Sequence, residues 1–470
     1  MAHFTWAIQS RMCALRSGTP VTHNKPRKQN GMTVTVRFAP SPTGLLHAGN
    51  ARTALLNWLF ARKMGGRFLL RIDDTDAARS TKAFEDAIYR DLAWLGLGHD
   101  GTDRQAARLP LYSAAFYQLQ AAGRLYPAYE TEAELERQRG LAAARHQPPI
   151  YNRASLDPAT RAKWEAEGRT PHWRFKLSRA KVAWTDLVRG TVEIDTATMS
   201  DPVLVREDGA FLYTLPSVAD DIDMAITHVV RGEDHVTNTA AQIEIFQALG
   251  APMPAFAHFP LLVGAGGEAL SKRLGSLSLD SLRADGMEAL AVAAYLAKIG
   301  TSDPVEPRHS LGELAGEFDF AKIGRAPAHF VPEELETLNA KTLHALPYDA
   351  ARLAPLGIGA PLWDAIRPNL TRLSDAAALA LLVTGPLTPL IEDAGLMTQA
   401  AALLPPEPWD EGTWPAWTKA VAQATGLKGK SLFHPLRLAL TGQEHGPELK
   451  KLLPLIGRAR TLARLEGKSA

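Results

Sequence analysis

The sequence predicts an α/β protein in which a doubly wound, Rossmann-like parallel sheet is interrupted by an insertion and followed by an all-α C-terminal region. Three observations indicate this: an early strand–helix–strand unit, a second run of strands and helices after residue 201, and Ala- and Leu-rich stretches cut by prolines further on. The 470 residues, 46% of them hydrophobic, suffice for roughly two to four domains. We expect an extension at residues 1–31, the first half of the sheet at 32–110 and an insertion at 111–200. The second half of the sheet should follow at 201–318, and a helical region of two sub-bundles at 319–470.

The first half opens with a β-α-β unit. Residues 34–38 alternate between hydrophobic and polar side chains, as in a half-buried strand. Hydrophobic residues recur at helical spacing over residues 51–64, and a Gly-Gly pair then ends the helix. Residues 67–72 predict the second strand.

The turn between this strand and helix has the features of a phosphate-binding site. It is rich in Pro, Ser and Gly and leads into a helix N-terminus, whose free N–H groups and positive dipole attract anions. We expect Gly44 and Gly49 to let a ligand approach the backbone closely. His47, in the first helical turn, can donate to a phosphate as charge builds up during a displacement.

The later elements are read from the same patterns. In the insertion we expect strands at 173–177 and 191–194. The second half is predicted to contain a hairpin or strand at 209–213, a strand at 224–231, a helix at 237–249 and another strand at 258–263. The two halves would meet at a topological switch point, where ligands bind beyond the carboxyl ends of the strands.

The C-terminal region reads as helical, for example over residues 376–383, and the Pro-rich run 404–409 predicts a hinge between its two sub-bundles. Residues 419–470 hold 10 Lys/Arg and 3 Glu in a chain whose net charge is +2. This charge is consistent with a nucleic-acid contact surface and equally with a solvated helical face. Residues 1–31 hold five Lys/Arg and no Asp or Glu, and we interpret them as an artefactual or disordered extension before a start at Met32.

Four motifs, in order along the chain, resemble those of the glutamyl-tRNA synthetases, which are class I aminoacyl-tRNA synthetases. Residues 37–54 (RFAPSPTGLLHAGNARTA) follow the first signature, with His47-Ala48-Gly49-Asn50 in the place of the H-I-G-H tetrad. Residues 70–76 (LRIDDTD) and 226–235 (ITHVVRGEDH) match two further family motifs, and residues 270–273 (LSKR) match the core of the K-M-S-K-S signature. The resemblance covers Met32 to the C-terminus and identifies the chain as a member of this family.

The resemblance implies the ATP-dependent ligation of L-glutamate to tRNA through glutamyl-adenylate. It implies that the insertion grips the acceptor end of the tRNA and that the helical region binds the anticodon. The partners would be tRNA(Glu) and L-glutamate, and charging of tRNA(Gln) is left open. We expect a cytoplasmic monomer. The sequence contains no apolar run of transmembrane length.

A glutamate pocket needs donors for two carboxylates and an acidic group for the ammonium. By the resemblance Arg37 and Tyr213 bound the side-chain end and Arg231 contacts the substrate across the pocket, although which arginine takes which carboxylate stays open. Asp73 would face the ammonium, where most relatives have Glu, so a bridging water or a shifted backbone would compensate for its shorter side chain. Ala39 and Ser41 would line the pocket.

The reacting phosphates would lie between His47 and Lys272, the latter on a mobile loop at residues 264–274, with Arg273 sharing the catalytic role. Ala269 replaces the first lysine of the family pattern. Mg²⁺ would accompany ATP to offset its charge. The residues expected to bind ATP are Pro40, Gly44, His47, Gly49, Asn50, His235, Leu270, Ser271 and Lys272.

No protein-bound metal is expected. Cys13 is the one cysteine, which excludes a disulfide framework and a cysteine-based zinc site, and Tyr126 to Tyr129 stand where some relatives carry zinc-binding cysteines. Among the alternatives, a glutaminyl-tRNA synthetase would have a different first signature and β-barrel anticodon domains. The short glutamyl-queuosine enzyme lacks an anticodon domain. A non-catalytic tRNA-binding paralogue is the remaining alternative, favoured only by Ala269 and Asp73.

Overall fold

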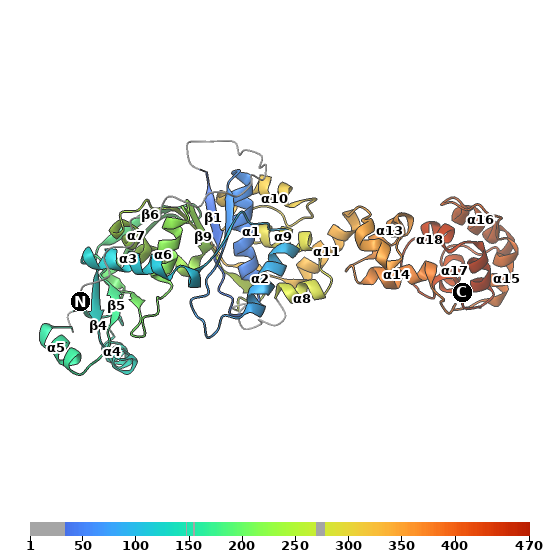
Figure 1. The fold of residues 1–470 in the computed structure, drawn as a ribbon. Coiled ribbons are helices and arrows are strands. Elements are labelled where there is room, and N and C mark those ends of the chain that lie inside the picture. Colours follow the sequence, from blue (N-terminus) through green and yellow to red (C-terminus); the bar gives the residue numbers. More distant parts are fainter. Residues whose placement is uncertain (1–32, 147, 154–155, 269–277) are drawn as a thin grey trace. The chain divides into compact units, whose positions relative to one another are not determined.

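The computed structural model describes residues 33–146, 148–153, 156–268 and 278–470. Two groups of strands form the sheet of the catalytic part (Figure 1). The first group is parallel, in the order β1-β2-β3, and comprises β1 (Thr35–Phe38), β2 (Arg67–Ile72) and β3 (Thr102–Arg104). The second has the order β9-β10-β6-β7, with β7 antiparallel to β6, and comprises β9 (His228–Gly232), β10 (Ala255–Phe259), β6 (Lys181–Asp186) and β7 (Gly190–Asp195).

The two groups meet at β1 and the start of β9. The N–H of Thr227 donates to the carbonyl of Thr35 at 2.9 Å, and the N–H of Thr35 donates to Thr227 Oγ1 at 2.8 Å. The strand order across the junction is therefore β3-β2-β1-β9-β10, so the chain adds strands on one side of β1 first and on its other side afterwards. This is the predicted doubly wound arrangement. Its topological switch point lies between β1 and β9, and in such folds ligands bind at the carboxyl ends of the strands on either side of that point.

Helix α1 (Ala48–Lys63) covers this junction. Ala51, Leu55 and Leu59 are buried, and they pack in one hydrophobic cluster with residues of β1, β2 and β9. The helix has His47 as its N-cap, at the edge of the first turn in which the sequence placed it, and Gly65 follows its end at a φ of 59°.

The sequence patterns did not predict several helices of the second half, among them α6 (Thr214–Asp223). The predicted strand at 224–231 was wrong at its start, because α6 and a turn occupy the residues before His228. The predicted strand at 258–263 is two strands, β10 and β11 (Leu262–Gly264), which are separated at Pro260; proline has no N–H to donate to a ladder. The expected hairpin at 209–213 is present as a turn, with a bridge between Val205 and Phe211.

The inserted part has its own antiparallel sheet, in the order β4-β5-β8. The predicted strand at 173–177 is β5, and the one at 191–194 is β7, which extends the second group instead. The elements from α2 to α7 not yet named are α2 (Lys82–Trp94), α3 (Leu109–Ala121), β4 (Leu125–Ala128), α4 (Glu132–Ala144), α5 (Pro158–Ala166), β5 (His172–Phe175), β8 (Val203–Val205) and α7 (Val236–Ala248).

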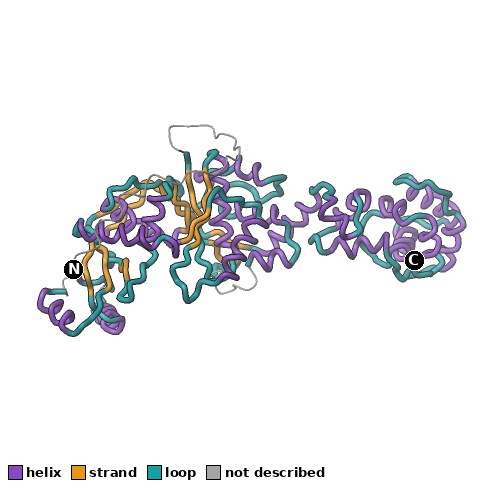
Figure 2. Tube along the Cα trace, viewed as in Figure 1, coloured by secondary structure: helices purple, strands orange, loops and turns teal. Residues whose placement is uncertain are grey.

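Among the described residues beyond β11 the regular elements are helices apart from β12 (Ala328–Phe330), which pairs with β11 (Figure 2). Buried side chains from both sides of the Pro-rich run 404–409 pack into one hydrophobic cluster, and the two sub-bundles stay a prediction. The helices are α8 (Leu279–Ala284), α9 (Ala289–Lys298), α10 (Leu311–Glu317), α11 (Pro332–Ala345), α12 (Ala350–Leu353), α13 (Ala360–Ile366), α14 (Asp375–Thr384), α15 (Ala394–Ala402), α16 (Thr413–Thr425), α17 (Lys430–Thr441), α18 (Leu449–Ile456) and α19 (Arg458–Leu465).

Candidate active site

His47 caps the N-terminus of α1 with its own side chain. Its Nδ1 accepts from the N–H of Gly49 at 3.0 Å and from the N–H of Asn50 at 3.4 Å. Burial lowers the pKa of His47, so the neutral ring is favoured, and with Nδ1 accepting, its proton lies on Nε2. The structure therefore leaves Nε2–H as a donor at the positive end of a helix, which suits an anionic ligand.

The two glycines of the first signature have different roles. A Cβ on Gly49 would lie 2.8 Å from Cε1 of His47, so this glycine makes room for the histidine ring. A Cβ on Gly44 would meet no atom within 4 Å. The small size of Gly49 is therefore needed by the protein itself, and the role of both glycines in ligand approach stays a prediction.

The loop before α1 is tied to the end of β2. The carbonyl of Pro40 accepts from the N–H of Asp73 at 3.0 Å, and the carbonyl of Pro42 accepts from the N–H of Thr81 at 3.1 Å. Pro40 is buried, Ala39 is partly buried and Ser41 is exposed. The backbone thus brings the first two signatures together at the carboxyl ends of β1 and β2.

Arg37, at the third position of β1, is buried and paired. Its Nε and Nη2 donate to the two oxygens of Asp221 on α6, at 2.9 and 3.2 Å. Arg71 on β2 donates through Nη1 to the same Asp221 at 3.0 Å. One carboxylate therefore holds two arginines of neighbouring strands, and α6 is the element that supplies it.

Both carboxylate oxygens of Asp73 accept hydrogen bonds from Arg71, Oδ1 from Nε at 2.6 Å and Oδ2 from Nη2 at 3.0 Å. Burial raises the pKa of Asp73, whereas for Arg71 the charges of Asp73 and Asp221 outweigh burial and raise its pKa well above the ordinary value. The contact between Asp73 and a substrate ammonium stays a prediction, and it would have to share a carboxylate that Arg71 already engages.

Sequence reasoning missed this network of buried charges. Arg71, Asp220 and Asp221 are each less than 5% exposed. Asp220 accepts from Gln105 at 2.8 Å and from Arg108 at 2.7 Å. A signal was present in the sequence: charged residues inside an otherwise hydrophobic strand, and adjacent aspartates in an otherwise apolar stretch.

Arg231, on β9, is buried without a carboxylate. It is 5% exposed, and within the described ranges no Asp or Glu oxygen lies within 4.0 Å of its guanidinium. Its donors are held by neutral groups: Nη2 donates to Thr239 Oγ1 and Gln242 Oε1, each at 2.7 Å, and Nε donates to His258 Nε2 at 3.2 Å. Burial lowers the pKa of Arg231. Because its Nη1 donates to the partly exposed Tyr213, this buried guanidinium is a candidate site for an anion.

Tyr213 and His235 border this cation. Tyr213 precedes α6, is 38% exposed, and its hydroxyl accepts from Arg231 Nη1 at 3.2 Å. The rings of Tyr213 and His235 lie 5.7 Å apart, and burial lowers the pKa of His235. The exposed tyrosine therefore connects the buried guanidinium to the protein surface.

Ala269, Leu270, Ser271, Lys272 and Arg273 lie outside the described residues, and their roles stay predictions. The residues that follow them are tied to the first signature. Ser278 forms a bridge with His47, and the N–H of Leu279 donates to the carbonyl of Leu46 at 2.9 Å. The chain therefore emerges from the predicted signature loop directly beside His47.

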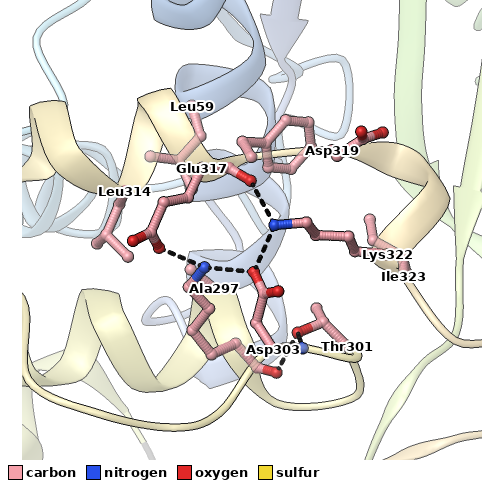
Figure 3. Close-up of a pocket in the computed structure, with 11 residues that line it drawn as sticks. Leu59, Ala297, Thr301, Asp303, Leu314, Glu317, Asp319, Lys322 and Ile323 are labelled. Carbon is pink, nitrogen blue, oxygen red and sulfur yellow. Dashed lines mark hydrogen bonds and ion pairs between the residues drawn. The ribbon is translucent and has the colours of Figure 1, made fainter.

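Two cavities lie away from these residues. One, between α9 and α10, has a volume of about 20 Å³, enough for a single water, and is bordered by the ion pairs of Lys298 and Lys322 (Figure 3). The other, about 220 Å³, lies in the inserted part and is lined by Arg139, Tyr151 and Arg174 among others. Within the described part of the chain no group of three or more His, Cys, Asp or Glu could hold a metal ion, and no helix is long and apolar enough to cross a membrane.

Comparisons with known proteins agree with this geometry. Residues 33–336 match the catalytic domain of class I tRNA synthetases (E and Q), and residues 365–468 match an anticodon binding domain. The glutamate–tRNA ligase 2 of Methylobacterium sp. (strain 4-46) is 59% identical over 447 residues, which cover 93% of this chain and 100% of the relative. The glutamate–tRNA ligase 1 of Parvibaculum lavamentivorans is 58% identical over 440 residues, 92% of this chain and 98% of the relative.

A solved structure is also similar. The crystal structure of a glutamate tRNA ligase from Elizabethkingia meningosepticum, in complex with its amino acid, superposes with a TM-score of 0.79 at 28% identity. The match covers 93% of this chain and 99% of the other. The family expected from the four motifs is thereby confirmed: the chain belongs to the class I tRNA synthetases of the E and Q family, with a catalytic domain followed by an anticodon-binding domain.

Proposed function

We propose that this chain ligates L-glutamate to tRNA in two steps, with glutamyl-adenylate as the intermediate. A substrate carboxylate attacks the α-phosphorus of ATP and releases pyrophosphate. The terminal ribose hydroxyl of tRNA then attacks the adenylate carbonyl and releases AMP. The names of the relatives support the substrate. The observation in this chain that carries the proposal is the buried guanidinium of Arg231, which has no carboxylate partner among the described residues.

Arg231 and Tyr213 would bind one carboxylate of glutamate. Arg37 would serve the other end of the pocket, but Asp221 already takes a bidentate pair from it. This assigns the stronger anion contact to Arg231, since no carboxylate of the described residues forms an ion pair with its guanidinium. Ala39, Ser41 and Asp73 complete the proposed pocket.

The phosphates of ATP would lie at the N-terminus of α1. The Nε2–H of His47 and the helix dipole would stabilise the charge that builds on them from one side, and Lys272 with Arg273 from the other. Mg²⁺ would arrive with the triphosphate as part of the substrate. No zinc is proposed, because the hydroxyls of Tyr126 and Tyr151 are already bound to Asp201 and Glu130 at 2.6 and 2.8 Å, in the part where some relatives carry cysteines.

The helical C-terminal region would bind the anticodon, as its family match and its basic tail suggest. We propose a monomer that charges tRNA(Glu). Charging of tRNA(Gln) is the finer question, because it depends on anticodon contacts that the described residues do not assign.

ATP–pyrophosphate exchange tests the first step. Exchange that depends on glutamate, measured with and without tRNA, is the expected result, and glutamine should not replace glutamate. Charging of purified tRNA(Glu) and tRNA(Gln) in separate reactions then identifies the tRNA. A chain that binds tRNA but shows no exchange under either condition would be the non-catalytic paralogue.

A further inference from the structure

A chain of buried side chains holds Arg231 from the side opposite Tyr213. His258 lies on β10, and its Nε2 lies 3.2 Å from Nε of Arg231. Nδ1 of the same ring lies 2.6 Å from Oδ2 of Asp186, on β6. The side chains of His258 and Asp186 are fully buried, at 0% exposure each. We infer that Asp186 and His258 are positioning residues that orient Arg231 for the substrate carboxylate, an inference that rests on the proposed function.

The hydrogen-bond donors determine the tautomer of His258. The Nε–H of arginine can only donate, so Nε2 of His258 must accept and the ring proton must lie on Nδ1. That proton is donated to Asp186. Protonation of both ring nitrogens would place an N–H against the guanidinium, and burial together with the charge of Arg231 opposes it by lowering the pKa of His258.

Asp186 is itself fixed by the backbone. Its Oδ1 accepts from the N–H groups of Val188, Arg189 and His258, at 3.0, 3.0 and 3.1 Å. Although burial opposes the charge, the bonds from His258 and these N–H groups hold the pKa of Asp186 below its ordinary value. The carboxylate therefore stays ionised and acts as a rigid acceptor for Nδ1–H.

The consequence for Arg231 is a fixed guanidinium plane. Nε is held by His258, and Nη2 is held by Thr239 and Gln242 on α7. Nη1 makes one hydrogen bond within the described part of the chain, to Tyr213, the partly exposed residue of the site. These contacts thus fix the Nε and Nη2 side of the guanidinium and leave Nη1, beside Tyr213, for a ligand.

The Asp186→Asn substitution separates this role from a structural one. Asparagine can keep Oδ1 for the three backbone N–H groups, but it presents an N–H to Nδ1 of His258. The ring proton must then move to Nε2, where it faces the Nε–H of Arg231. We expect the KM for glutamate to rise about 5- to 50-fold, the scale of one buried donor left unsatisfied. The KM for ATP and the thermal unfolding midpoint should stay near the wild-type values.

Two variants of His258 give the second measurement. His258→Phe removes the ring's hydrogen bonds with Arg231, Asp186 and Thr239 and should raise the KM for glutamate as Asp186→Asn does. His258→Gln places an amide oxygen near the position of Nε2 and should restore much of the wild-type KM. Asp91→Asn is the matched control, because Asp91 is a buried carboxylate, 1% exposed, that pairs with Arg283 outside the proposed site. Its KM for glutamate should be that of the wild type.

The tautomer can be read directly by ¹⁵N NMR of the histidine ring. The expected result is an Nδ1–H ring in the wild type and an Nε2–H ring in Asp186→Asn. If the wild type charges tRNA with glutamate but Asp186→Asn has the wild-type KM for glutamate, the positioning role of Asp186 and His258 is wrong and the proposed function stands. If the wild type does not use glutamate, the proposed function is wrong, whatever the tautomer.

Discussion

At the scale of single residues, the buried arginines of the proposed site are of two kinds, those paired with a protein carboxylate and one held by neutral groups. Arg37 and Arg71 share the carboxylate of Asp221, whereas Arg231 is held by neutral groups alone among the described residues. A paired arginine gains little from a substrate carboxylate, because its charge is already compensated. An unpaired one gains more, and this contrast makes Arg231 the residue to test first.

The Arg231→Ala variant should weaken glutamate binding while the fold is retained. Loss of a charge-assisted contact is expected to raise the KM for glutamate on the order of 10- to 100-fold. Arg231→Lys should also be impaired, since a lysine has no planar fork to satisfy Thr239, Gln242 and His258 together. Steady-state charging over a range of glutamate concentrations measures this, and normal saturation would rule Arg231 out as the clamp.

Lys272→Ala tests the other side of the phosphates. We expect adenylate formation to slow by a factor on the order of 10²–10³, the usual scale for one donor that acts in the transition state. Pre-steady-state formation of the adenylate is the measurement. Unchanged rates would refute the role assigned to Lys272.

Gly49→Ala should displace the ring of His47. The added methyl group would lie 2.8 Å from its Cε1, so the ring must rotate and lose the bonds from the helix N-terminus. We expect kcat to fall about tenfold or more, with little change in the KM for glutamate. Gly140→Ala is the control, because Gly140 is also helical and a Cβ there meets no atom within 4 Å. Equal activity of the two variants would argue against a role for the His47 ring.

At the scale of elements, α6 decides how the site is assembled. It supplies Asp220 and Asp221 to arginines of β1, β2 and the start of α3. Tyr213 directly precedes it. One short helix therefore sets the position of the paired arginines and of the residue that borders the unpaired one. Its hydrophobic residues recur at helical spacing (Leu215, Val218, Ala219 and Ile222), so the pattern of a half-buried helix was present in the sequence and was overlooked.

The packing of α9 against α10, away from the proposed site, depends on another buried cation. Lys298, at the end of α9, pairs with Asp303 at 2.7 Å and with Glu317 of α10 at 2.6 Å. Its side chain is 5% exposed. We expect Lys298→Met to lower the free energy of unfolding by about 1–3 kcal/mol, because two carboxylates lose their shared partner.

The matched control for this prediction is Lys322→Met. Lys322 also pairs with Asp303, at 3.1 Å, but its side chain is 38% exposed. Exposed ion pairs contribute about 0–1 kcal/mol, so the control should be nearly as stable as the wild type. Urea unfolding of the three proteins compares them, and equal midpoints would contradict the proposed contribution of the buried pair.

At the scale of the whole molecule, buried histidines make stability depend on pH. Burial lowers the pKa of five histidines: His47, His172, His228, His235 and His258. The unfolded chain, with histidine pKa values near about 6.5, binds more protons below that pH than the folded chain does. Stability is therefore complete above about pH 6.5 and is lost as the pH falls through the lower folded values.

Urea midpoints measured between pH 7.5 and 5.5 check this. We expect the midpoint to fall toward pH 5.5, and a His228→Gln variant should show a shallower fall, because one of the five contributions is removed. His228 is chosen because its ring contacts Phe60 and Thr227 and not the proposed substrate. A midpoint that stays level or rises toward pH 5.5 would contradict the linkage.

Much of this protein could be predicted from local sequence. The strand, turn and helix of the first signature depend on residues near in sequence, so the β-α-β unit and the position of His47 were predictable. The family motifs added the doubly wound sheet and the helical C-terminal region, and the family match bears out both. The break in the strand at Pro260 was also readable, since proline lacks the N–H that a ladder needs.

The charge state of the site was decided by the tertiary structure. Asp221 lies 184 positions from Arg37 and 150 from Arg71, and Asp186 lies 72 from His258. No local pattern says which of these charges meet, because the pairing is made by strands and helices that come together only in the folded chain. Local chemistry thus indicated candidate residues for binding phosphate and carboxylate, and packing determined that, among the described residues of the proposed site, Arg37 and Arg71 form ion pairs with Asp221 and Arg231 forms none.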